Sequence, residues 1–201
     1  MKRITLILIG SLLLGNLSYG QAVDDRTVIP VAVTLSSILR LNVVSGGNIE
    51  FNFNTLADYQ NGIDNSSSYD TRFTVASSVD WDVFMYSEEA SLVSTDDVAA
   101  AGMDLDNVGY HVLSNGTFDI ADLAVSSSDP TAPAALTSAE VVIVGYNGTV
   151  TNAGDIQQND FTIHWECGTM IGGMNSNSIL SQQLAADRYS TNVFLILRPT
   201  P

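Results

Sequence analysis

The sequence predicts an all-β protein, a single antiparallel β-sandwich of about eight to ten strands with short helical turns in its loops. Two observations predict this class. After residue 22, apolar and polar residues alternate with a period of two, as in strands that bury one face. These runs are short and are bounded by Gly, Asn, Asp and Ser, which are typical of turns. No long segment has the period of an amphipathic helix, and no internal repeat is found.

Residues 1–22, MKRITLILIGSLLLGNLSYGQA, are predicted to be a signal peptide that is removed. Lys2 and Arg3 precede the apolar run Ile4–Leu14, which is too short to cross a bilayer of about 30 Å. Small residues near position 20 suit signal peptidase, so we expect the mature chain to begin at Gln21 or Val23. Residues 23–201 are then one domain, secreted to the cell exterior, the outer cell surface or the periplasm.

The first predicted strand is Thr27–Leu35, TVIPVAVTL, which places Ile29, Val31, Val33 and Leu35 on one face. A terminal strand with a fully apolar face has to be covered, because an uncovered one pairs with other chains. It either pairs within its own sandwich or is lent to a neighbouring subunit. We take the second alternative as the hypothesis for assembly. Lysine, a common guard against edge pairing, is absent after residue 2.

Alternation predicts the remaining strands in chain order. They are Leu39–Val43, Ile49–Phe53, Phe73–Val75, Trp81–Met85, Asp160–Gly168 and Asn192–Arg198. The inward positions of these runs and of the region around residue 143 predict the core. Its expected members are Leu41, Phe51, Phe73, Trp81, Val83, Val142, Val144, Ile163, Trp165, Val193 and Leu195.

Two hairpins are predicted where Asn-Gly lies between alternating runs, at Asn115-Gly116 and Asn147-Gly148. Asn-Gly favours the type I′ turn, which matches the twist of paired strands. Short helical segments are predicted at Thr95–Ala101 and Ile179–Ala186. Residues 54–69 and 126–138 are predicted to be loops.

The charge of the chain is strongly negative. Seven basic residues face 22 acidic ones, and loss of Lys2 and Arg3 with the signal peptide leaves five arginines and a net charge of −17. Such a field disfavours nucleic acid and anionic membrane surfaces as partners. We expect no membrane insertion of the mature chain, and self-association or other cell-surface proteins as partners.

Catalytic chemistry is not indicated. In FTIHWECG, alternation directs Cys167 to the face of Ile163 and Trp165 and directs His164 to the opposite face, so the thiol and imidazole do not form a nucleophilic pair. His111 and His164 lack metal-type partners nearby in sequence. No catalytic or cofactor-binding residue and no metal site is predicted.

Two binding alternatives stay open. Loop carboxylates are solvated by default, but those between residues 96 and 106 are potential calcium ligands, namely Asp96, Asp97, Asp104 and Asp106. Tyrosines beside loops suit boundary packing or sugar binding, and these are Tyr59, Tyr69, Tyr110, Tyr146 and Tyr189.

The C-terminal pattern Asp187-Arg188-Tyr189, then Ser-Thr-Asn and VFLILRP, resembles the final strand of secreted bacterial immunoglobulin-like sandwiches. VDWDVFMYS and NIEFNFN are similar to strands of the same group, which includes spore-coat-U-like proteins and chaperone–usher pilins. The resemblance implies a non-enzymatic structural or adhesive subunit of a bacterial surface layer or filament. A glycan- or calcium-binding extracellular module is the alternative function.

Overall fold

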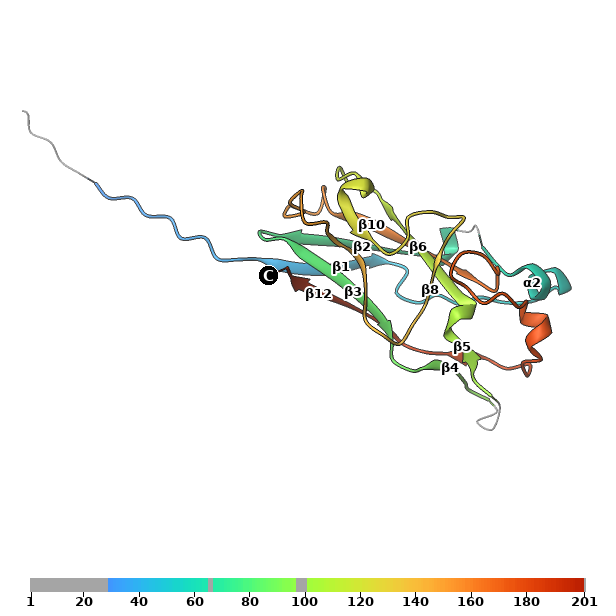
Figure 1. The fold of residues 1–201 in the computed structure, drawn as a ribbon. Helices are drawn as coiled ribbons and strands as arrows, with labels where there is room; N and C mark the ends of the chain where they lie inside the picture. The colour runs from blue at the N-terminus through green and yellow to red at the C-terminus, as the bar shows by residue number, and fades with distance from the viewer. Residues whose placement is uncertain (1–28, 65–66, 97–100, 201) are drawn as a thin grey trace, which may run out of the picture. The chain divides into compact units, whose positions relative to one another are not determined.

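The computed structural model describes residues 29–64, 67–96 and 101–200. Contacts divide the chain into two units, residues 1–35 and 36–201. The larger unit is mostly β, with antiparallel sheets and short helical turns, which confirms the predicted all-β class (Figure 1). The predicted signal peptide and most of the predicted helical segment Thr95–Ala101 lie outside the described residues. No described helix is long and apolar enough to cross a membrane.

Three antiparallel sheets make up the larger unit. The first has the strand order β1 (Leu39–Ser45), β2 (Asp70–Ser77), β10 (Asp160–Cys167), β6 (Val108–Ser114) and β8 (Ala134–Ala135). The second has the order β12 (Val193–Pro199), β3 (Trp81–Ser87), β9 (Val141–Tyr146) and β7 (Leu123–Val125). A small third sheet has the order β11 (Tyr189–Ser190), β4 (Ser91–Ser94) and β5 (Met103–Asp104).

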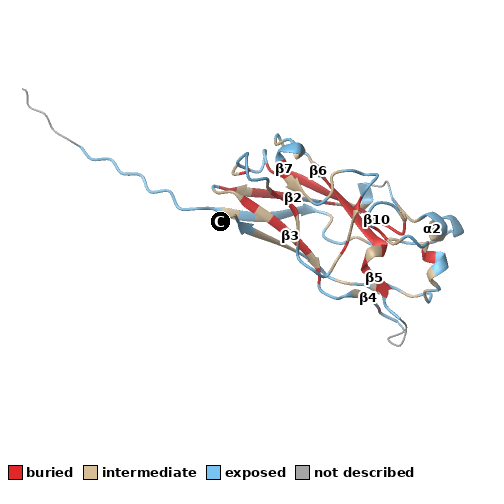
Figure 2. Cartoon of the chain, viewed as in Figure 1, coloured by how far each residue is buried: buried red, intermediate tan, exposed pale blue. Residues whose placement is uncertain are grey.

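The first two sheets share one core, because alternate residues of both point to the same apolar cluster. Trp81 of β3 meets Phe161 of β10 edge to face, with ring centroids 6.0 Å apart. Figure 2 shows the buried residues concentrated on β2, β3, β6 and β10. The contact between Trp81 and Phe161 therefore joins β3 of the second sheet to β10 of the first.

Most of the predicted core is confirmed. Six of its members are buried, and these are Phe73, Trp81, Val83, Val144, Ile163 and Trp165. Leu41, Phe51 and Leu195 are half-buried and pack against the cluster. The prediction of Val193 as a core residue is wrong, since this residue is 37% exposed. Val142 is only half-buried, because a register shift between Val83 and Phe84 gives the inward positions of β9 to its neighbours.

Both predicted hairpins are wrong. The Asn115-Gly116 segment follows β6 in the first sheet and leads to β7 in the second, so it joins sheets and not neighbouring strands. A Cβ at Gly116 would lie 2.0 Å from the Gln158 carbonyl oxygen, and this close approach explains the glycine. Asn147-Gly148 likewise follows β9 on the path to β10. There the Asn147 side chain accepts hydrogen bonds from Thr149 and Val150, which forms an Asx-type turn.

The predicted loop 54–69 contains a helix, α2 (Leu56–Asn61), that the sequence reading missed. Its signal was the capping box. Thr55 accepts a hydrogen bond from the Asp58 backbone, while the Asp58 carboxylate accepts one from the Thr55 backbone. The predicted helical segment at Ile179 is a short 3₁₀ turn, η4 (Ile179–Gln182), and the other 3₁₀ turns are η1 (Ser67–Tyr69), η2 (Leu105–Asn107) and η3 (Ile120–Asp122).

The segment predicted as the first strand is not a strand in its described part, residues 29–35. Ile29, Val31, Val33 and Leu35 are 79–89% exposed. A strand requires a partner edge, and none of the described residues supplies one here. The residues from Leu39 onward do form the predicted next strand, β1.

Candidate functional site: a groove between two sheet edges

Two edge strands, one from each of the two larger sheets, lie side by side. β1 pairs with β2 alone and β12 pairs with β3 alone, so each keeps one unpaired edge. In Figure 1 these strands approach each other near the C-terminus. Between them and the segments that adjoin them lies a groove of about 950 Å³.

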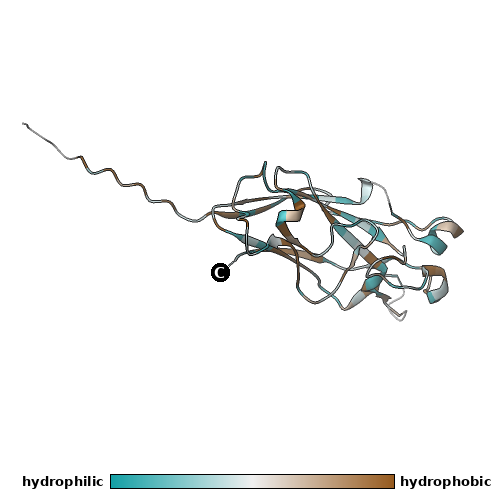
Figure 3. Cartoon of the chain, turned by 45° about the horizontal axis from the view of Figure 1, so that its top comes forward, coloured by the Kyte–Doolittle hydropathy of each residue, from teal (hydrophilic) through white to brown (hydrophobic). Residues whose placement is uncertain are grey.

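The groove is apolar because strand alternation directs side chains into it. Leu195 pairs with core-facing Met85, yet it is only half-buried, since no described strand lies beyond β12. Leu41 of β1 is half-buried on the opposite wall. Ile163 and Trp165 of β10 are buried at the base. Figure 3 shows hydrophobic residues, in brown, alternating with hydrophilic ones along the strands of the larger unit. All four residues were predicted as core, and the groove they line was not predicted.

Residues 46–54 continue the wall beyond β1. Gly46, with φ of +72°, ends the strand, and its Cα lies so close to β2 that a Cβ would meet the Asp70 carbonyl oxygen at 1.9 Å. Ile49, Phe51 and Phe53 alternate inward as predicted, and Phe51 stacks on Tyr69 with centroids 4.5 Å apart. The expected strand Ile49–Phe53 nevertheless belongs to no β-ladder among the described residues. Its backbone is available for pairing.

An ion pair joins the two walls of the groove. Arg188 Nε lies 3.5 Å from Glu50 Oε1, and both side chains are more than half exposed. Exposed pairs of this kind contribute at most about 1 kcal/mol. The pair therefore does not hold the groove closed against a ligand that binds tightly.

Cys167 lies at the groove lining and is 3% exposed, on the core side of β10 as predicted. Burial, with a smaller contribution from Glu166, raises the pKa of the thiol to about 12. The thiol is protonated at neutral pH, and this protonation state does not suit a nucleophile.

The candidate calcium ligands are not gathered. Within residues 29–64, 67–96 and 101–200, no cluster of three or more His, Cys, Asp or Glu residues has a geometry that would hold a metal ion. Asp106 accepts a hydrogen bond from Asn175, and the Asp96 backbone donates to Asp187. Asp104 flanks η2, and Asp97 is outside the described residues.

The tyrosines considered for sugar binding are spread over several regions. Tyr69 stacks on Phe51, Tyr59 lies edge-on to Phe53, and Tyr110 is buried in the core. The Tyr189 hydroxyl donates to the Ala185 carbonyl oxygen. Tyr146 ends β9 in the other sheet. They act as boundary and core packing residues.

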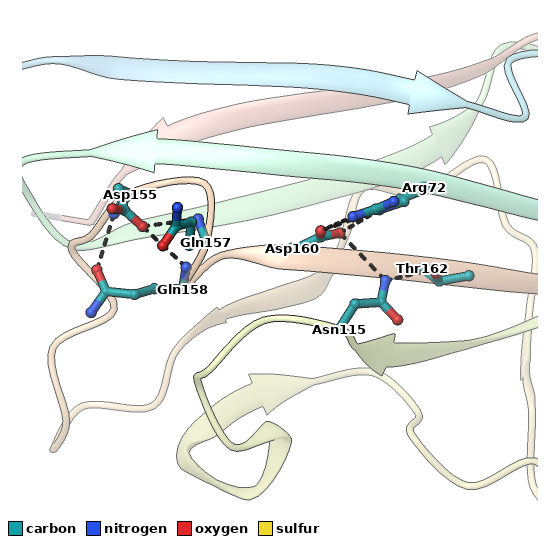
Figure 4. Close-up of polar contacts among 7 residues, drawn as sticks. All are labelled: Arg72, Asn115, Asp155, Gln157, Gln158, Asp160 and Thr162. Atoms are coloured by element: carbon teal, nitrogen blue, oxygen red, sulfur yellow. Dashed lines mark hydrogen bonds and ion pairs between the residues drawn. The ribbon is translucent and has the colours of Figure 1, made fainter.

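A polar cluster on the five-stranded sheet has a structural role. Arg72 donates to both carboxylate oxygens of Asp160, and Asn115 bridges Asp160 and Thr162 (Figure 4). The Arg72 guanidinium, helped by Asn115 and opposed by burial, lowers the pKa of Asp160. The cluster therefore ties β2, β10 and the segment that follows β6 together.

No known protein family matches this chain, and no curated protein matches it.

Proposed function

We propose that this protein is a secreted, non-enzymatic structural or adhesive subunit of a bacterial surface layer or filament, with an immunoglobulin-like sandwich as its body. In this proposal, residues 27–35 of one copy add a strand to the groove of the next. One observation carries it: a segment with four exposed apolar side chains at strand spacing occurs in a chain with an apolar groove between two unpaired strand edges.

The segment and the groove are complementary in length and chemistry. Nine extended residues span about 30 Å, and the seven residues of β1 span about 23 Å. An inserted strand would direct Ile29, Val31, Val33 and Leu35 toward the apolar base, and its backbone would pair with the free edges of β1 and β12. Pro30 falls at an outward position, where its missing N–H removes a hydrogen bond to one edge only.

The occupant we propose is the segment of a second copy. Each of the four side chains is more than three-quarters exposed. Burying an aliphatic side chain contributes about 1.5–3 kcal/mol, so covering all four is a substantial driving force for association. The net charge opposes close approach of copies, and a short apolar strand supplies a local contact that overcomes it.

The test begins with a mature protein that lacks residues 23–35. We expect a folded monomer where the full mature protein associates, as measured by analytical ultracentrifugation. A synthetic peptide of residues 27–35 should bind this truncated protein and raise its melting temperature, because a ligand of the folded state stabilises it by mass action.

Two peptide variants make the test specific. Val33→Asp places a charge on the inward face, while Ala32→Asp adds the same charge one residue away on the outward face. We expect Val33→Asp to weaken binding at least tenfold, since a carboxylate is costly in an apolar groove, and Ala32→Asp to bind nearly as the parent does. Equal losses from both variants would contradict groove insertion. Unfolding of the truncated protein, or a full-length protein that stays monomeric with its segment protected, would show that the strand belongs to its own sandwich.

A further inference from the structure

A row of titratable side chains crosses three strands on the outer face of the five-stranded sheet. The register places His164 of β10 opposite both His111 of β6 and Asp70 of β2. The two imidazole rings have centroids 4.9 Å apart. His164 Nδ1 lies 2.6 Å from Asp70 Oδ1, within hydrogen-bond distance.

The two histidines differ in what surrounds them. The His164 side chain has a carboxylate partner and remains 14% exposed. His111 is 6% exposed, and its Nδ1 is buried without a hydrogen-bond partner among the described residues. A proton on His111 would therefore create a poorly solvated cation beside a second imidazole.

Charged groups from each neighbouring element face this pair. They are Glu166 of β10, Asp70 of β2, and Asp129 of the loop that follows β7. Burial first, and then His164, lowers the pKa of His111, while Asp70 and Asp129 oppose the shift. The 126–133 loop is attached to β6 here, since the Val112 N–H donates to the Ser127 carbonyl oxygen at 2.8 Å.

We propose that the Asp70–His164–His111 row is a proton-sensitive device, which keeps β6 and the 126–133 loop packed on the sheet at neutral pH and loosens them in acid. The direction in which stability changes with pH follows from the number of protons that each state binds. An unfolded histidine titrates near pH 6.5, and His111 in the fold titrates lower, so below about pH 6.5 the unfolded state binds more protons. The contribution of His111 to the free energy of unfolding is fully present above about pH 6.5. It is lost as the pH falls toward the lowered pKa of His111 in the fold.

The test is urea unfolding of the full mature chain between pH 7.5 and 5, with wild type compared with His111→Gln. We expect the unfolding constant of wild type to rise by up to tenfold per pH unit below pH 6.5, in excess of any change in the variant. Glu166→Gln is the matched control. Burial raises the pKa of Glu166, which gives the opposite pH dependence, so the acid loss should persist in this variant.

Proton NMR of wild type provides a second readout that does not depend on the variant's folding. The His111 ring should titrate below pH 6.5, and the Val112 amide should exchange faster as it does. Parallel pH curves for wild type and His111→Gln, or a His111 ring that titrates at or above pH 6.5, would overturn the proposal. So would stabilisation of wild type by zinc chloride at pH 7.5 that His111→Gln abolishes, because the pair would then be a metal site.

Discussion

At the scale of single residues, buried polar side chains bond specific backbone groups and so fix where strands begin. Asn152 and Trp81, both fully buried, form the clearest case. The Trp81 backbone N–H donates to Asn152 Oδ1 at 3.0 Å, and Asn152 Nδ2 donates to the Trp81 carbonyl oxygen at 2.7 Å. The side chain thus replaces a strand partner at the start of β3.

We therefore expect Asn152→Ala to lower the free energy of unfolding by about 3 kcal/mol, because it leaves two buried backbone groups unpaired. Asn147→Ala removes the exposed turn bonds of a similar asparagine and should cost under about 1 kcal/mol. Urea denaturation measures both. Equal costs would show that the Trp81 contacts carry no special weight.

The ion pair between Arg72 and Asp160 is partly buried. Arg72→Met should lower stability at pH 7 modestly, because Arg72 is half exposed and solvent screens its ion pair with Asp160. Arg72 holds the pKa of Asp160 down in the fold, so the stabilisation is present above about pH 4, the unfolded value, and is lost as the pH falls through the folded one.

The difference between wild type and Arg72→Met should thus narrow in acid, as measured by urea unfolding between pH 7 and 3. Arg188→Met removes the exposed pair with Glu50 and should change stability little at any pH. A gap between wild type and Arg72→Met that stays constant down to pH 3 would exclude Asp160 as the linked group.

At the scale of elements, the ends of strands decide where the groove lies. β1 ends at Ser45, after a register shift between Val43 and Ser45, and Gly46 follows it with a positive φ as the chain leaves the ladder. Beyond it, residues 47–53 keep an inward alternation without a ladder. The wall of the groove therefore changes from a paired strand to an extended segment without a ladder at Gly46.

Gly46→Ala should destabilise the protein by about 2 kcal/mol or more, since it combines a positive φ with a Cβ forced against the Asp70 carbonyl oxygen. Gly47→Ala is the matched control, because a Cβ there meets nothing within 4 Å. Gly46→Ala should lower the melting temperature and weaken binding of the 27–35 peptide, whereas Gly47→Ala should change neither. An unchanged melting temperature for Gly46→Ala would contradict the close packing of this turn.

At the scale of the whole molecule, a formal charge of −17 on the predicted mature chain is combined with an apolar segment and an apolar groove. If copies associate as proposed, charge repels them at long range and burial of the segment favours their contact. These two effects respond differently to salt, since only the first is screened.

Self-association of the full mature protein should thus strengthen as sodium chloride rises from 10 to 300 mM, because the screening length shrinks from about 30 Å to under 8 Å. Sedimentation velocity at fixed protein concentration measures this. The protein without residues 23–35 should stay monomeric throughout. Association that weakens with salt would indicate contacts between opposite charges and would contradict a hydrophobic strand contact.

The sequence by itself determined the all-β class, several of the longer strands and the orientation of their faces. A period of two assigns each side chain to one face, as the core positions of Trp81, Ile163 and Cys167 confirm. It also determined that residues 27–35 carry one apolar face, although their use in assembly stays a prediction.

Only the tertiary structure decided which strands are neighbours. Asn-Gly signals a turn, but the signal does not say whether the chain returns to the same sheet or crosses to the other, and here both segments cross. The groove and the His111–His164 pair arise from residues more than 50 positions apart in the chain. Alternation shows which side chains face the core, whereas their partners depend on long-range packing that no local pattern encodes.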